Sequence, residues 1–154
     1  MTLKHFKSAE FRNYWHLMNR GFLVMCDNIR EQSGFKMIVS PNPESLGRTS
    51  GGGWHNYIVH KEVFAADFFV SFDGKPLNQT QALYFRQCAL DCGIKGIGLY
   101  PHWVGPVGTG FHLDGRTVLT NKVGRDYDAW GRITKNGKIV DVSFKQALEY
   151  LPKY

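Results

Sequence analysis

The stretch AADFFVSF at 65–72 constrains the fold more than any other part of the chain. Its side chains alternate between two faces, as they do along a strand that is buried on one side. The even-numbered positions would form the core face, and Asp67 would lie on the other, less apolar face. Asp73-Gly74 then supplies a turn. The sequence therefore predicts a sheet strand here, with one polar group held beside it.

The other predicted elements mix helices and strands without a repeating strand–helix unit. Apolar residues recur at helical spacing over 15–32, and Gly34 is a stop signal for that helix. Asn78 and Ser143 can each cap a later helix. Strands are predicted at 35–40, 96–100 and 111–114, loops at 41–53 and 101–110, and a hairpin at 132–142 with its turn at Asn136-Gly137. This order predicts the α+β class, with a small antiparallel sheet flanked by helices.

The length of 154 residues favours one domain over residues 1–154, and the 43% of hydrophobic residues is enough for its core. The three cysteines do not suggest a disulfide framework. No stretch approaches the roughly 18–20 apolar residues of a spanning helix, and no signal peptide is expected at the start. The formal charge of +6 favours a polyanionic partner such as a bacterial cell wall. Without a stripe of Lys and Arg or a nucleic-acid motif, we expect neither nucleic-acid binding nor membrane insertion.

Three polar side chains could be the protein ligands of one catalytic metal. His60 precedes Asp67 by seven residues, and His112 lies in a later predicted strand. Two histidines and a carboxylate suit a catalytic zinc with an open position for water. The odd separation requires a turn at 61–64 to bring His60 and Asp67 to one side. On spacing alone, a solvated His60 and an Asp67 that forms a cap or an ion pair are the simpler interpretation. His55 is the alternative ligand.

Three segments together resemble a known family. VHKEVFAADFFV, then GIGLYP, then FHLDGR are similar to the LAS-type zinc peptidases, in the branch of D-alanyl-D-alanine carboxypeptidases and phage endolysins. The resemblance runs loosely from about Phe6 to Arg116. It implies a hedgehog/D-Ala-D-Ala-peptidase-like fold, and zinc held by His60, Asp67 and His112. Arg48, in the loop SPNPESLGR, would stand near the substrate-binding arginine of that family.

The sequence departs from the family pattern at the catalytic base. Members of the family usually carry an acid or a histidine shortly before the last zinc ligand, and PHWVGPVGTGF has no acid there. A zinc-bound water needs a group within hydrogen-bond reach to take its proton. Asp114 and His102 are the candidates for that catalytic role. Asp114 could instead orient His112, and Arg116 is expected to pair with Asp114 or a nearby carboxylate.

The resemblance implies a zinc metallopeptidase that hydrolyses peptide bonds in bacterial peptidoglycan stem peptides, as a D,D-carboxypeptidase or an endopeptidase. Such an enzyme would be an endolysin-like monomer, made in the host cytoplasm and acting on the cell wall, or associated with the virion. The alternative is a non-catalytic zinc-binding module, structural or wall-binding, of a phage particle. The missing acid favours this alternative, and a basic nucleic-acid binder is a weaker third interpretation.

Overall fold

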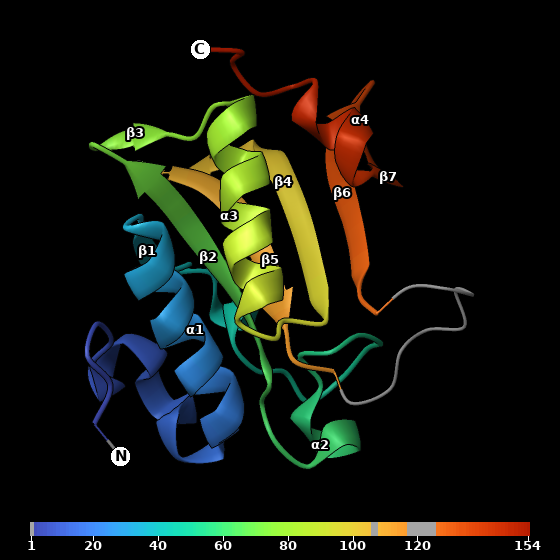
Figure 1. Cartoon of the computed structure of the whole chain (residues 1–154). Coiled ribbons are helices and arrows are strands. Elements are labelled where there is room, and N and C mark those ends of the chain that lie inside the picture. The colour runs from blue at the N-terminus through green and yellow to red at the C-terminus, as the bar shows by residue number, and fades with distance from the viewer. Residues whose placement is uncertain (1, 106–107, 117–125) are drawn as a thin grey trace.

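A mixed sheet organises the chain and positions its polar site (Figure 1). The computed structural model describes residues 2–105, 108–116 and 126–154, and the strands in these residues form one seven-stranded sheet. The strand order is β1-β2-β5-β4-β6-β7, and the short β3 pairs with β2. The strands are β1 Lys36–Val39, β2 Ala65–Phe72, β3 Lys75–Pro76, β4 Gly96–Gly105, β5 Gly108–Asp114, β6 Asp128–Lys135 and β7 Lys138–Ser143.

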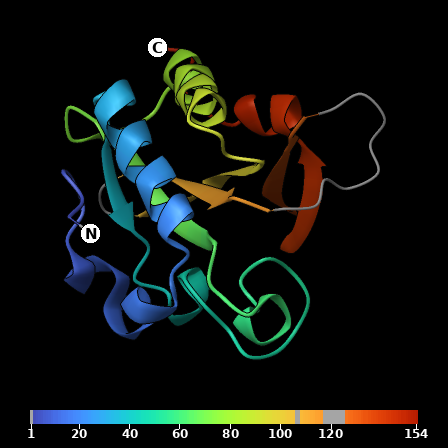
Figure 2. The same cartoon turned by 60° about the horizontal axis from the view of Figure 1, so that its bottom comes forward.

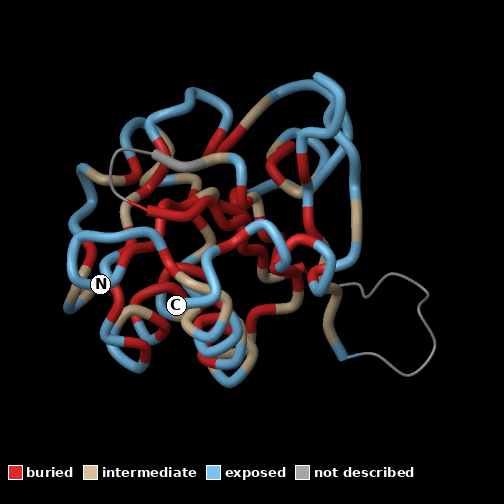
Figure 3. The backbone as a smooth tube through the Cα atoms, turned by 90° about the horizontal axis from the view of Figure 1, so that it is seen from above, coloured by how far each residue is buried: buried red, intermediate tan, exposed pale blue. Residues whose placement is uncertain are grey.

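The longer helices cover one face of this sheet (Figure 2). The helices are η1 Ser8–Leu17, α1 Arg20–Ser33, η2 Pro43–Ser45, α2 Tyr57–His60, α3 Gln79–Asp91 and α4 Phe144–Leu148. Phe68 of β2 lies opposite Phe111 of β5, and the Phe111 ring packs 4.7 Å from Phe85 of α3. Buried residues therefore follow the central strands (Figure 3), and residues that alternate with this core point to the opposite face.

Local signals set several element boundaries as predicted. Gly34 ends α1 in the left-handed conformation, with φ of 69°, which a residue without Cβ adopts at little cost. Asn78 caps α3 by accepting from the backbone N–H of Gln81, and Ser143 caps α4 in the same way. Asn136 and Gly137 form the hairpin turn with positive φ at both positions, as a type I′ turn requires. The mixture of helices and strands agrees with the predicted α+β class.

The predicted sheet was wrong in size and in one pairing. The seven strands of the described residues are more than a small sheet, and β4 and β6 pair in parallel. This follows from the chain path, because β5 returns antiparallel to β4 and β6 then runs beside β4 on its other side. The loop expected at 101–110 is also largely strand. The register shift between Tyr100 and Val104 interrupts the alternation there, and Pro101 hid the strand in the sequence.

No helix in the part of the chain that the structure describes is long and apolar enough to cross a membrane.

Candidate metal centre

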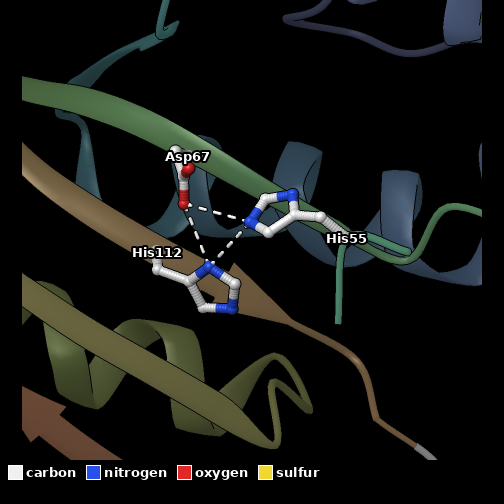
Figure 4. A group of neighbouring side chains, drawn as sticks. All are labelled: His55, Asp67 and His112. Atoms are coloured by element: carbon white, nitrogen blue, oxygen red, sulfur yellow. Dashed lines mark hydrogen bonds and ion pairs between the residues drawn. The ribbon is translucent and has the colours of Figure 1, made fainter. Parts of the chain in front are cut away.

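Two neighbouring strands and one loop bring three ligand-type side chains together (Figure 4). Asp67 of β2 lies directly opposite His112 of β5, so both side chains leave the sheet on the face away from the helices. His55 comes from the loop before α2. Backbone hydrogen bonds hold this loop, among them those from Arg48 N–H to the His55 carbonyl and from Tyr57 N–H to the Arg48 carbonyl.

The three side chains converge on a small volume. The Nδ1 atom of His112 lies 3.0 Å from Oδ1 of Asp67 and 3.1 Å from Nε2 of His55. Nε2 of His55 is 3.4 Å from the same Asp67 oxygen. Both imidazoles are buried, and the three potential ligand atoms all lie within 4.8 Å of one another. Two histidines and a carboxylate at this spacing could hold a metal ion, and they are donors that zinc prefers.

The outer hydrogen bonds decide where the imidazole protons are. Nδ1 of His55 lies 2.9 Å from the Leu46 carbonyl, which can only accept, so this nitrogen carries the proton. Nε2 of His112 lies 2.9 Å from Oδ2 of Asp114 and likewise donates. If both rings are neutral, Nε2 of His55 and Nδ1 of His112 therefore present lone pairs to each other and to the Asp67 carboxylate. Three acceptors facing one point need a cation between them, which is either an additional proton or a metal ion.

The pKa values of His112 and Asp67 also indicate that the cluster favours a positive charge. Burial alone would lower the pKa of His112, but hydrogen bonds to Asp114 and Asp67 outweigh burial and raise it to about 9. Burial raises the pKa of Asp67, yet the hydrogen bonds with His112 and His55 outweigh it and lower this pKa to about 2. Without a metal, the cluster therefore holds an extra proton on His112 at neutral pH, and a metal would take its place.

Asp114 holds His112 from the side away from the cluster. Its carboxylate accepts from Nε and Nη2 of Arg116, each at 2.7 Å, and also from the Arg116 backbone N–H. Nη1 of Arg116 reaches Asp128 at 3.4 Å. Burial would raise the pKa of Asp114, but the bonds from Arg116 and His112 hold it well below its usual value. The expected pairing of Arg116 with Asp114 is confirmed.

This geometry favours the orienting role of Asp114 over the role of catalytic base. Asp114 contacts Nε2 of His112, whereas Asp67 and His55 contact Nδ1 on the other edge of the ring. A base must reach the water beside the ligand atoms. Both oxygens of Asp114 are already engaged by Arg116 and His112.

Two glycines on β4 make room for this network. A Cβ on Gly96 would lie 2.2 Å from Oδ2 of Asp114 and 2.4 Å from Nη2 of Arg116. A Cβ on Gly98 would lie 2.8 Å from the Trp130 ring, which packs 5.2 Å from the ring of His112. The pattern Gly-Ile-Gly therefore reports close approach of side chains from other elements. This pattern was the available sequence signal for a large side chain such as Trp130 at this position.

His60 lies outside the group that the structure brings together. It ends the four-residue helix α2, and Lys61 follows in the left-handed conformation with φ of 71°. This turn sends the His60 ring to stack on Trp54, with 5.0 Å between the ring centroids, and places Nε2 3.3 Å from the Gly53 carbonyl. Within the described residues, His55 takes the position beside Asp67 and His112 that the resemblance gave to His60.

A cleft of about 940 Å³ opens above the cluster. Arg48 lines it from the loop, and its Nη2 donates to the Gly52 carbonyl. His102 lines it from β4, exposed, with its ring 4.9 Å from that of Tyr150. The cleft thus contains the cluster, Arg48 and His102. Its remaining walls include Trp54, Tyr100, Trp103, Trp130, Arg132 and Asp141.

No protein-family model matches this chain, and neither the curated proteins nor the solved structures include a significant match to it.

Proposed function

We propose that the protein is a zinc metallopeptidase that hydrolyses peptide bonds in bacterial peptidoglycan stem peptides. One observation carries this proposal: two imidazole lone pairs and a carboxylate oxygen converge on one point in an open cleft. The resemblance of the segments around Asp67 and His112 to the LAS-type peptidases supports the same chemistry. It also supports a hedgehog-like fold, with His55 in place of His60 as the third ligand.

The cleft residues would have distinct tasks in this reaction. Nε2 of His55, Oδ1 of Asp67 and Nδ1 of His112 would hold zinc, and bound zinc supplies Lewis acidity for water and for the peptide carbonyl. Asp114 keeps the proton of His112 on Nε2, so that Nδ1 stays available as a ligand. Arg48 would bind a polar group of the substrate. His102 is the proposed proton carrier, because it is exposed in the cleft.

The setting of this activity follows from the same proposal. The substrate would be a cell-wall peptide, attacked as a D,D-carboxypeptidase or as an endopeptidase. The protein would work as an endolysin-like monomer that reaches the wall from the host cytoplasm, or from the virion. Its formal charge of +6 suits an anionic wall.

A second function is favoured by one feature of the site. Asp114, the acid closest in sequence to His112, is buried and engaged by Arg116, which leaves the cluster without an evident carboxylate base from β5. A non-catalytic zinc-binding module, structural or wall-binding, of a phage particle would need no such base.

The two functions separate in a digest of purified peptidoglycan, with the products identified by mass spectrometry, with and without a zinc chelator. Chelator-sensitive cleavage supports the peptidase, and the product masses identify the bond. Zinc binding without cleavage of several wall types would select the non-catalytic module. The His55→Ala variant should lose both zinc binding and cleavage, whereas His60→Ala should keep both.

A further inference from the structure

We infer that Trp54 is a positioning residue for His55, because the indole ring of Trp54 lies on the guanidinium of Arg116 and joins the loop before α2 to the sheet. For zinc, this role rests on the ligand set proposed above. The role also goes beyond the proposed activity, since a peptidase and a non-catalytic zinc-binding module would both need His55 in the same place.

The loop that carries His55 to the cluster (Figure 4) leads to it through a run of exposed residues. Residues 49–53 (TSGGG) are all exposed, and Gly51 and Gly53 have positive φ. Glycine loses more conformational freedom on folding than any other residue, so this run alone would leave His55 poorly placed. Contacts made after the run must therefore fix the position of the imidazole.

Hydrogen bonds within the loop fix its shape. Nδ1 of His55 lies 2.9 Å from the Leu46 carbonyl, and the His55 carbonyl accepts from the N–H of Arg48. Nδ2 of Asn56 donates to the Gly51 carbonyl at 2.8 Å. These partners all belong to the loop itself, and the buried Leu46 anchors its start. The end of the loop needs an anchor on the sheet as well.

The ring of Trp54 supplies an anchor at that end. The guanidinium carbon of Arg116, which follows β5, lies 4.5 Å from the centre of the Trp54 ring. Arg116 is 4% exposed, and a cation is attracted to a tryptophan ring most strongly where water is excluded. Phe64, which precedes β2, packs 5.8 Å from the same ring. The indole therefore joins the loop to both strands that supply metal ligands.

This contact connects the loop to the carboxylate that orients His112. Arg116 donates from Nε and Nη2 to Asp114, each at 2.7 Å. The same carboxylate accepts from Nε2 of His112 at 2.9 Å. A continuous chain of contacts thus runs from Trp54 to His112. It sets the ligand from the loop relative to the ligand from the strand.

His60 contacts the same indole from the end of α2. The two rings stack at 5.0 Å between centroids, with 23° between their planes. The histidine that the resemblance assigned to the metal therefore packs on the residue that positions His55. His60→Ala should leave zinc binding intact, because the contact between Trp54 and Arg116 remains.

The first readout uses the metal-free protein and follows the ring nitrogens of His55 by NMR, assigned with the His55→Gln variant. In the unaltered protein the proton should lie on Nδ1, because this nitrogen donates to the Leu46 carbonyl. Trp54→Leu should release the loop, so that the proton no longer stays on Nδ1. Trp54→Phe keeps an aromatic face for Arg116 and should retain more of the Nδ1–H signal.

The second readout is zinc affinity, measured by competition with a chromophoric chelator. Trp54→Leu should weaken zinc binding about tenfold or more, as is typical when a residue that orients a metal ligand is lost. Trp54→Phe should lose less. Trp103→Leu is the matched control, because Trp103 is another half-buried tryptophan of the cleft but packs on Phe69 and Tyr100. It should change neither the zinc affinity nor the His55 signal.

Two results would overturn the role of Trp54. One is an Nδ1 proton on His55 that persists in Trp54→Leu, and the other is an equal loss of zinc affinity in Trp54→Leu and Trp103→Leu. If Trp54→Leu does not fold in urea-denaturation controls, Trp54→Phe against Trp103→Phe gives the same comparison. If the unaltered protein binds no zinc, the proposed function fails, whereas the metal-free signal of His55 still decides whether Trp54 positions it.

Discussion

The cleft is lined by the arginines of two arginine–aspartate pairs that differ in their surroundings. Side chains of the Arg116–Asp114 pair are 3% and 0% exposed, and those of Arg132–Asp141 are 47% and 67% exposed. The buried pair uses Nε and both Nη groups on two aspartates, and its guanidinium lies between the rings of Trp54 and Trp130. Among the hydrogen bonds of the described residues, the exposed pair uses Nε alone. One pair therefore fixes geometry, and the other remains available to a ligand.

Breaking the buried pair should give the largest effect. Arg116→Met leaves the buried Asp114 carboxylate without its arginine partner, which costs about 3–5 kcal/mol of unfolding free energy. Urea denaturation measures this loss. Arg132→Met is the matched control, because exposed pairs contribute roughly 0–1 kcal/mol. Similar losses in the two variants would contradict the distinction between the pairs.

The buried network should also make the metal-free protein sensitive to pH. The pKa of His112 rises from 6.5 to about 9 on folding, so the stabilisation is fully present below pH 6.5 and is lost as pH rises through about 9. The loss should be roughly 3 kcal/mol in urea denaturation with a chelator present. His102→Gln, which alters an exposed histidine, should keep this dependence. A flat profile between pH 6.5 and 9.5 would show that His112 holds no extra proton.

Zinc should stabilise the folded protein through the buried cluster and not through the exposed Arg132–Asp141 pair. At a free concentration about one hundred times its Kd, a metal that binds only the folded state stabilises by about 2.7 kcal/mol. This gain should appear in thermal unfolding of the unaltered protein, of Arg132→Gln and of His60→Ala. It should disappear in His55→Ala. A gain that survives in His55→Ala and vanishes in His60→Ala would restore the ligand set given by the resemblance.

Crowding the buried pair should have a smaller effect than removing its arginine. Gly96→Ala places a methyl group where Asp114 and Arg116 lie, and overpacking of this kind costs about 1–3 kcal/mol. Gly52→Ala is the control, because nothing lies within 4 Å of a Cβ at that position. Equal stability of the two variants in urea would mean that the network shifts without strain.

Local chemistry made much of the fold predictable from the sequence. The bounds of β2 match AADFFVSF, but Ala65, Phe69 and Ser71 of the other face are buried too, and Phe72, expected in the core, is exposed. Gly34, Asn78 and Ser143 mark helix ends through caps that depend on nearby residues. The parallel neighbour of β4 was not predictable in this way. Which strand lies beside β4 depends on how distant segments pack, and no short pattern encodes that choice.

The site was predictable in its strand residues and ambiguous in its loop residue. Asp67 and His112 lie opposite each other because two regular strands pair in one register. The third position depends on the path of the loop before β2. There His60 ends a four-residue helix, just before the left-handed Lys61, and its ring stacks on Trp54. His55 points to the cluster instead. Both histidines suit zinc chemically, so residue type alone could not choose between them.

Glycines on β4 and β5 leave space for two tryptophan rings that shape the cleft. Gly98 gives its space to Trp130, and Gly110 gives its space to Trp103, where a Cβ would lie 2.8 Å from each ring. The strands thus supply backbone and ligands, while aromatic rings from other positions supply the contour. In the proposed peptidase, substitutions at those tryptophans would reshape the cleft without altering Asp67 or His112. The surface that would select a substrate could therefore diverge while the proposed metal ligands stay the same.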